Sequence, residues 1–357
     1  MPIRVAVVGY GYGGRTLHVP LIAATDGLEM SLVVSSDPAK VALDFPRLRT
    51  VSNAGQAFSD PEIDLVVIAT PNDSHAPLAE QAIHAGKHVV VDKPFTICSE
   101  DGLRLARLAE TSGRLLGVYH SRRWEADFLV LKDILASGEL GVVTYFESRL
   151  DRYRPIVRDR WRERAEPGAG IWYDLGSHLI DQALQLFGRP QAISADIVSQ
   201  RIGSGADDYF HAVLFYEQRR VVLHSSCLVV ANDLRFVVHG TTGSFIKSGL
   251  DPQEAALQLR VIPGSAGWGA DPRPGRVTLA SEAKPRTVAG PAGDYRCFYA
   301  GIRDAIWGVG PNPVPALEAV EVIEIIEAGL KSEATGVRVD LRYPIPAHQC
   351  SASPSKL

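Results

Sequence analysis

The sequence predicts an α/β fold in two parts: a doubly wound parallel sheet, and then an α+β part with a large, mostly antiparallel, open-faced sheet. Two patterns support this prediction. In the first third of the chain, short β-branched apolar runs alternate with segments of helical character, which is typical of a parallel sheet covered by helices. Farther along, apolar and polar residues alternate with period two, which is typical of an antiparallel sheet with one covered face. The length of 357 residues suits about two domains.

The strands expected in the parallel sheet are nearly continuous in apolar residues, as strands covered on both faces are. They cover residues 3–8, 28–34, 65–69, 88–91 and 115–118. Helices are expected between them at 77–85 and 100–110, and each is followed by a glycine that favours a helix end. We therefore assign residues 1–121 to the first domain.

After the fifth strand the pattern changes to one helix and several period-two segments. The helix is expected at 124–136, and the strands at 143–150, 210–216 and 221–228. Residues 263–291 are rich in Gly, Pro and Ala, which predicts a long loop, and a last amphipathic helix is expected at 316–330. We assign 122–343 to the second domain and expect the polar tail, 344–357, to be disordered.

The composition excludes several classes of protein. Hydrophobic residues make up 46% of the chain and charged residues 22%, as in an ordinary globular protein. The net charge of -4 argues against nucleic acid as the main partner. The four cysteines lie far apart and suggest neither a zinc site nor a disulfide framework. No apolar run is long enough for a signal peptide or a membrane span, so we expect a cytoplasmic protein without a membrane partner.

A glycine motif directly follows the first expected strand. Gly9, Gly11 and Gly14 have the spacing G-x-G-x-x-G. In this pattern the first glycine makes a tight turn, the second lets a pyrophosphate approach the backbone, and the third allows close packing of the next helix. Because the motif joins a strand to a helix, it predicts a Rossmann-type dinucleotide site, with Tyr12 among the residues that contact the cofactor.

Ser36 and Asp37 stand at the end of the second strand, about 20 residues beyond the glycines. A carboxylate at this point binds the ribose hydroxyls of NAD. Ser36 and Lys40 could instead hold the 2′-phosphate of NADP, and Asp37, which precedes a proline, could simply cap a helix. The choice between NAD and NADP therefore stays open.

Two more polar loops follow the third and fourth expected strands, at the edge where open α/β sheets bind ligands. They supply the other expected cofactor contacts: Thr70, Pro71, Asn72, His75, Asp92 and Lys93. Lys93 comes directly after a buried strand and before Pro94, whose ring restricts the backbone. We expect its ammonium group to reach a substrate hydroxyl beside the nicotinamide.

A helix expected at 171–187 carries Asp174 and His178 one turn apart. This spacing lets a carboxylate orient an imidazole for general acid and base catalysis. It is also the spacing of an ordinary helix-stabilising pair. One helix with two carboxylates and one histidine lacks further ligands, so no metal site is expected.

Residues 152–164 contain six arginines interleaved with aromatic side chains. Such a segment suits the lining of a polyol pocket, in which Tyr153, Arg160 and Trp161 would contact the substrate. A solvated loop is one alternative. RNA binding is another, but the acidic balance of the chain opposes it.

Taken together, these motifs resemble the glucose-fructose oxidoreductase and inositol dehydrogenase family. The resemblance is carried by the glycine motif, residues 70–75, the pair Lys93-Pro94, and residues 168–178, and it extends to about residue 341. Longer stretches at 86–94, 119–124 and 158–163 are similar to the branch with NADP-dependent scyllo-inositol dehydrogenases.

The family resemblance implies that Lys93, Asp174 and His178 surround the carbon that gives up hydride. Three positions depart from the family pattern. Asp92 replaces a usual glutamate, and Ser121 replaces a frequent asparagine. Asp37 stands where the NADP-using inositol enzymes often carry arginine, which again leaves the nucleotide open.

These observations lead to one expected function. The chain is expected to be an NAD(P)-dependent dehydrogenase that acts on a secondary hydroxyl, or the matching ketone, of a cyclic polyol or sugar. His178 would take the hydroxyl proton, Asp174 would hold the imidazole, and Lys93 would stabilise the alkoxide. The alternative is a regulatory protein that binds NAD(P) without catalysis. Because the second sheet has an exposed face, we also expect a homodimer or homotetramer formed through it.

Overall fold

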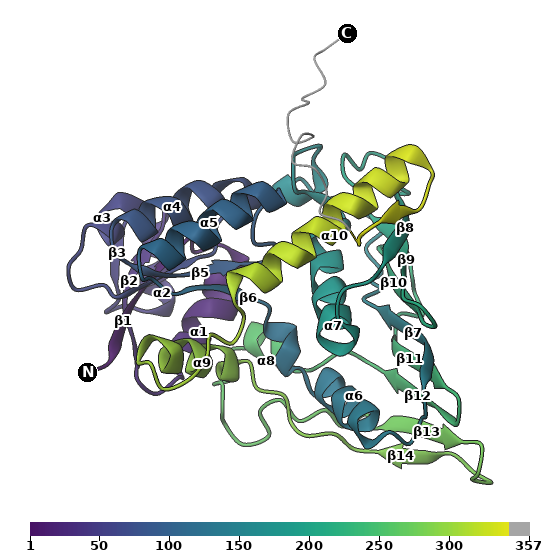
Figure 1. The fold of residues 1–357 in the computed structure, drawn as a ribbon. Coiled ribbons are helices and arrows are strands. Elements are labelled where there is room, and N and C mark those ends of the chain that lie inside the picture. The colour runs from purple at the N-terminus through teal and green to yellow at the C-terminus, as the bar shows by residue number, and fades with distance from the viewer. Residues whose placement is uncertain (343–357) are drawn as a thin grey trace.

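The computed structural model describes residues 1–342 and contains two sheets with helices packed around them (Figure 1). The first sheet has six parallel strands in the order β3-β2-β1-β4-β5-β6. Its strands are β1 (Ile3–Val8), β2 (Leu28–Val34), β3 (Arg49–Val51), β4 (Leu65–Ile68), β5 (His88–Asp92) and β6 (Leu116–Tyr119). This is the strand order of a doubly wound dinucleotide-binding sheet, so the predicted fold class of the first part is confirmed.

The strands of this sheet agree closely with the sequence prediction, apart from β3. That strand has only three residues and begins with an exposed arginine, so it lacks the apolar run that revealed the others. The helices that flank the sheet are α1 (Val19–Ala23), α2 (Pro38–Asp44), α3 (Ala54–Phe58), α4 (His75–His84) and α5 (Ser99–Thr111). Figure 1 shows α4 and α5 on one face of the sheet and α1 on the other.

The second sheet has nine strands in the order β14-β13-β12-β11-β7-β10-β9-β8-β15. All neighbours in it are antiparallel except β7 and β10. The strands are β7 (Val143–Arg149), β8 (Ala192–Val198), β9 (Tyr209–Phe215), β10 (Arg220–Ser226), β11 (Leu234–Gly240), β12 (Gly243–Ser248), β13 (Gly275–Leu279), β14 (Arg286–Val288) and β15 (Val339–Asp340). This mostly antiparallel sheet confirms the second half of the predicted fold class.

The helices of the second part are α6 (Ala126–Ser137), α7 (Ser177–Phe187), α8 (Gln253–Gln258), α9 (Arg296–Ile306) and α10 (Ala316–Thr335). In Figure 1, α6, α7 and α10 all lie on the same side of the sheet. Along β9, buried residues alternate with half-buried ones. One face of the sheet therefore packs on helices, and the other is open in the described structure, as the period-two pattern predicts.

The prediction of one long loop at 263–291 is wrong in part, because this segment contains β13 and β14. The two strands pair with each other, and β13 also pairs with β12. In β13 only Gly275 and Val277 are buried, and the residues between and after them are polar or partly exposed. Strands at the edge of a sheet need little apolar surface, so glycine and arginine masked the pattern in the sequence.

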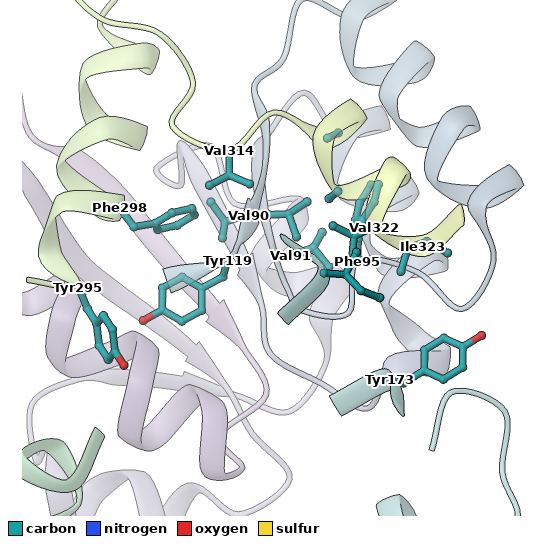
Figure 2. Packing of buried hydrophobic residues seen from close by; sticks show 14 of the residues in the cluster. Val90, Val91, Phe95, Tyr119, Tyr173, Tyr295, Phe298, Val314, Val322 and Ile323 are labelled. Atoms are coloured by element: carbon teal, nitrogen blue, oxygen red, sulfur yellow. The ribbon is translucent and has the colours of Figure 1, made fainter. Parts of the chain in front are cut away.

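The end of the chain returns to the first sheet and holds the two sheets together. Val118 in β6 donates a backbone hydrogen bond to the carbonyl of Val314 (3.2 Å). Beside it, the ring of Tyr119 packs edge-on against that of Phe298 in α9 (centroids 5.0 Å apart), as Figure 2 shows. Helix α10 packs against α5. This packing fixes the position of the second sheet against the carboxyl ends of the first sheet's strands.

The predicted tail, 344–357, lies outside the described residues. Within residues 1–342, no helix is both long and apolar enough to cross a membrane.

Candidate active site

A cavity of about 1000 Å³ lies between the two sheets. On one side it is lined by the loops that follow β1, β2 and β4. On the other side it is lined by Lys93, which follows β5, by the segment 152–162, by the start of α7 and by the helix α8. The cavity thus lies at the carboxyl ends of parallel strands, where open α/β sheets bind ligands.

The three glycines of the motif have three different environments. Gly9 has a φ of +100°, and a Cβ atom there would meet the carbonyl oxygen of Ala69 at 2.6 Å. A Cβ atom on Gly14 would come within 2.0 Å of the carbonyl oxygen of Gly9. A Cβ atom on Gly11 would meet nothing within 4 Å. Gly9 and Gly14 therefore serve the packing of the loop, and Gly11 leaves an open approach from the cavity, as a pyrophosphate group requires.

Tyr12 joins the glycine loop to the second part of the molecule. Its hydroxyl donates to Glu254 Oε1 (2.6 Å) and accepts from Gln258 Nε2 (2.7 Å), and both partners belong to α8. All three side chains line the cavity. Glu254 and Gln258 could not be predicted, because nothing in the sequence of α8 indicates that it lies against a loop some 240 residues earlier.

Ser36, Asp37 and Lys40 lie together at one end of the cavity. Asp37 caps α2, since its Oδ1 accepts a hydrogen bond from the backbone N–H of Lys40 (3.0 Å). The ammonium group of Lys40 donates to the carbonyl oxygen of Tyr10 (3.2 Å). The capping role raised in the sequence analysis is therefore present, and Asp37 still faces the cavity beside the two groups that could hold a phosphate.

Thr70 and Pro71 line the cavity, but Asn72 and His75 lie behind it. Asn72 is buried, and its amide donates to the carbonyl oxygen of Gly168 (2.8 Å). The ring nitrogens of His75 lie 2.9 and 3.0 Å from the carbonyl oxygens of Pro94 and Thr70. The predicted contact of Asn72 and His75 with the cofactor stays a prediction, but neither residue belongs to the cavity lining. Both are buried by the loops that they connect, so they position the site from outside the cavity.

Lys93, Asp174 and His178 meet on the cavity wall. The ammonium group of Lys93 donates to Asp174 Oδ1 and to the carbonyl oxygen of Asp174, both at 2.7 Å. His178 faces the cavity, and its Nδ1 atom is buried without a hydrogen-bond partner among residues 1–342. Nε2 is therefore the ring nitrogen available to a ligand.

The expected pairing of Asp174 with the imidazole of His178 is not present. Residues Trp172–Gly176 form a π-helical turn before α7. The carboxylate of Asp174 instead pairs with Lys93, and among residues 1–342 the imidazole makes no hydrogen bond to a carboxylate.

The surroundings of this trio set its charges. Burial raises the pKa of Asp174, but the adjacent Lys93, Arg162 and Arg152 outweigh it and hold the pKa well below its usual range. Burial lowers the pKa of Lys93, and Asp174 opposes that shift. Burial and the neighbouring Lys93 charge hold the pKa of His178 well below its usual range. At neutral pH the carboxylate is therefore ionised and the imidazole is neutral, ready to accept a proton.

The arginine segment forms the rest of this wall. Arg152 and Arg162 lie 3.7 and 4.0 Å from the carboxylate of Asp174. Arg160 and Trp161 also line the cavity, in agreement with the sequence analysis. Tyr153 is 54% exposed and lies outside the lining, and its contact with a substrate stays a prediction. In an extended backbone, Tyr153 points to the face opposite its neighbour Arg152.

Comparison with known proteins agrees with this architecture. Residues 3–120 match the model for the oxidoreductase family NAD-binding Rossmann fold, and 132–341 match that for the oxidoreductase family C-terminal alpha/beta domain. The chain belongs to the glucose-fructose oxidoreductase and inositol dehydrogenase family.

Several relatives cover almost the whole chain. YdgJ of Escherichia coli, an uncharacterized oxidoreductase, is 51% identical over 92% of this chain and 96% of its own length. The scyllo-inositol 2-dehydrogenase (NADP(+)) IolW of Bacillus subtilis is 40% identical over 92% of this chain and 93% of its own. The solved structure of YPO2259 from Yersinia pestis is 52% identical, with a TM-score of 0.92 over 95% of this chain and 97% of its own.

Arg122 is a further cationic residue that the sequence analysis did not place at the site. It lines the cavity and pairs with Glu125 and, at 3.3 Å, with Glu254. It follows β6 directly, so it stands at the same sheet edge as Lys93. The position of Arg122 shortly after a predicted parallel strand is the sequence signal that could have indicated its place in the site.

Proposed function

We propose that this protein is an NAD(P)-dependent oxidoreductase that transfers hydride between the nicotinamide and a secondary hydroxyl, or the matching ketone, of a cyclic polyol or sugar. The observation that carries the proposal is the position of Lys93 and His178 on one cavity wall, with a glycine loop on the other. The relationship to IolW, a scyllo-inositol 2-dehydrogenase, supports the choice of substrate class.

The residues around the glycine loop fit a dinucleotide. Gly11 leaves the space that a pyrophosphate needs, and Ser36 and Asp37 stand where the adenosine ribose would bind. When bound, the nicotinamide ring supplies the hydride-accepting carbon, C4. Because Asp37 and Lys40 lie side by side in the lining, the site offers partners to NAD and to NADP alike.

The protein's own residues would handle the proton and the developing charge. In the oxidation, the C–H bond of the alcohol carbon breaks, and its electron pair leaves with the hydrogen as hydride for the nicotinamide. The O–H bond breaks as well, and the neutral imidazole of His178 takes the proton at Nε2. The Lys93 ammonium group stabilises the oxygen while it carries negative charge, and Asp174 holds that ammonium in place. Reduction of the ketone reverses each step.

A substrate screen tests the proposal. Inositols, pentoses and hexoses would be incubated with each nucleotide while the absorbance of the reduced nicotinamide is followed. We expect turnover with at least one cyclic polyol or sugar, and a loss of about 100-fold or more in kcat for His178→Ala with an unchanged nucleotide Kd. Tight nucleotide binding without turnover on any compound would contradict the proposal and favour a regulatory protein. Near-normal turnover by His178→Ala would reject the assigned base.

The open face of the second sheet supports a second, structural proposal, a homodimer or homotetramer formed through this face. Tyr209 and His211 in β9 and His224 in β10 project from it, and their rings pack edge to face at 5.3 and 5.7 Å. A sheet face with aromatic side chains is a suitable surface for a second copy. Light scattering tests this, and a monomeric mass at micromolar concentration would contradict it.

A further inference from the structure

The cavity wall opposite the glycine loop carries an excess of positive charge. The whole cavity lining contains eight Lys and Arg side chains and four Asp and Glu side chains. The complete chain has the opposite balance, a net charge of -4. The excess is concentrated on the segment 152–162, whose five arginines all line the cavity.

Most of these cations already have a carboxylate. Lys93, Arg152 and Arg162 share Asp174, at 2.7, 3.7 and 4.0 Å. Arg160 pairs with Glu163 at 2.5 Å.

Two guanidinium groups remain without a partner. Among residues 1–342, the side chains of Arg154 and Arg158 make neither an ion pair nor a hydrogen bond, although Arg154 is only partly exposed. Burial and the nearby charges of Arg152 and Arg160 lower the pKa of Arg154. An unpaired guanidinium beside other cations is unfavourable, and an anion bound there would relieve the repulsion.

The backbone that carries these arginines is held in place. Arg152 and Arg154 donate backbone hydrogen bonds to the carbonyl oxygens of Ser226 (2.9 Å) and Cys227 (2.7 Å). Tyr153, between them, forms an antiparallel bridge with Leu228, and alternation along this extended stretch directs Arg152 and Arg154 to the same side.

A second set of contacts fixes the turn at Arg158. Its backbone N–H donates to Glu163 (2.8 Å), which also lies 3.3 Å from Arg201. Arg201 in turn pairs with the fully buried Asp208 at 2.7 Å. The backbone that carries these two side chains is therefore held in place, although the side chain of Arg158 is exposed, and a ligand need not order the backbone to reach them.

We propose that the substrate is a sugar or polyol with one anionic group, a carboxylate or a phosphate ester, which Arg154 and Arg158 bind. The proposal rests on the proposed function and narrows its substrate class. Guanidinium groups bind both anions through paired N–H donors, whereas a neutral polyol would leave these charges unpaired.

The spacing along the segment places this group away from the reacting carbon. Arg152 lies at the Lys93 and Asp174 end of the site, and Arg154 is two residues farther along an extended backbone, about 7 Å. The anionic group would then be bound at one end of the substrate while the hydroxyl at the other end faces Lys93 and His178. The phosphates of the nucleotide are expected at Gly11 and Ser36, on the opposite wall.

Matched substrates test this proposal. Glucose, glucuronate and glucose 6-phosphate form one set, and myo-inositol and inositol 1-phosphate form another. We expect kcat/KM to be at least about 100-fold higher for an anionic member than for its neutral counterpart. Comparison of glucuronate with glucose 6-phosphate shows whether the site prefers a carboxylate or a phosphate ester. Calorimetric binding of the same compounds to the nucleotide complex gives the answer even where turnover is absent.

Three substitutions complete the test. Arg154→Gln and Arg158→Gln should raise KM, or the calorimetric Kd, for the anionic compound about 10-fold to 100-fold, with kcat, nucleotide Kd and activity on the neutral compound nearly unchanged. Arg164→Gln, on the same segment but outside the cavity lining and paired with Asp159, is the matched control and should change nothing.

Two results would overturn the proposal. One is equal or better binding of the neutral compounds by the wild-type protein. The other is a rise in nucleotide Kd in Arg154→Gln or Arg158→Gln without any change for the anionic compound, which would assign the arginines to the nucleotide. Failure of the proposed function is distinguishable, because it would appear as absence of turnover despite anion binding.

Discussion

The cavity wall around the glycine loop consists largely of backbone and small side chains, whereas the opposite wall consists of charged side chains. The first wall comes from one short stretch of sequence and from loops at one edge of the parallel sheet. The second brings together Lys93, the segment 152–162, Asp174 and His178. The difference indicates that the first wall selects its ligand by shape and the second by charge. We therefore expect substitutions that add atoms to impair function most at the first wall. Substitutions that remove a charge should impair function most at the second wall.

The largest expected effect is that of removing a charge from the second wall. We expect Lys93→Met to lower kcat about 1000-fold, because the oxygen of the substrate loses its nearest cation, while the nucleotide Kd changes little. Steady-state kinetics with the best substrate of the screen and nucleotide titration measure both quantities. Lys132→Met, on the exposed face of α6, is the control and should keep normal activity. A kcat within tenfold of the wild type would show that the second wall does not depend on this charge.

Two glycines test whether the first wall works by shape. We expect Gly11→Ala to raise the nucleotide Kd about 100-fold without a change in melting temperature, because its Cβ points into open space that the pyrophosphate needs. Gly14→Ala should lower stability by about 1–3 kcal/mol, because its Cβ would meet the carbonyl oxygen of Gly9 at 2.0 Å. Thermal unfolding and nucleotide titration separate the two. Equal effects of both substitutions on both measurements would contradict the assigned roles.

Asp37 is a position on the first wall where charge should matter. We expect Asp37→Ser to shift the ratio of the NADP and NAD dissociation constants about tenfold towards NADP, because a carboxylate that repels the 2′-phosphate is lost. Serine also caps helices, so the stability of α2 should be retained. Asp37→Asn, another good cap, provides a second neutral variant. An unchanged ratio in both variants would place the ribose contact elsewhere.

The smallest expected effect concerns the pH dependence of the second wall. The proposed oxidation would use His178 in its neutral form, and the pKa of His178 is held well below its ordinary value. The rate should therefore show no loss through His178 as the pH falls from about 8 to 6, whereas a histidine of ordinary pKa would lose about fourfold at pH 6. In Lys93→Met the pKa of His178 should rise, because a neighbouring cation is gone, and the residual activity should fall at higher pH than in the wild type. A loss of rate with a midpoint near pH 6.5 in the wild-type protein would contradict this prediction.

The first wall could be predicted from the sequence because its parts lie close together along the chain. The strand, the glycine loop and the next helix are contiguous, and Gly9, Gly11 and Gly14 each fill the place that their spacing indicated. Residues 70–75 were also located correctly, but the sequence did not show which of them face inwards. Whether His75 points into the cavity or behind it depends on Pro94, which arrives from another loop.

For the second wall, the sequence predicted which residues belong to it but not how they pair. Lys93 and Asp174 are 81 residues apart, and their ion pair depends on how the two sheets are docked. The i, i+4 spacing of Asp174 and His178 could not show that the Asp174 carboxylate turns to Lys93 instead. The exclusion of Tyr153 follows from strand-like pairing of its neighbours with residues 226–227, which only the folded chain reveals. Charge composition is visible in a sequence, but the partners of each charge are a property of the fold.

The return of α9 and α10 to the first sheet has a consequence for the order in which the chain can fold. All six strands of the parallel sheet have been synthesised by residue 119, yet β6 is covered by Phe298 and by residues near Val314, and α5 is covered by α10. Residues 1–121 alone would therefore expose an apolar flank that chaperones bind. This flank cannot be covered until almost the whole chain has been synthesised. Nucleotide binding by a nascent chain should accordingly appear late, and a fragment that ends at residue 121 should aggregate.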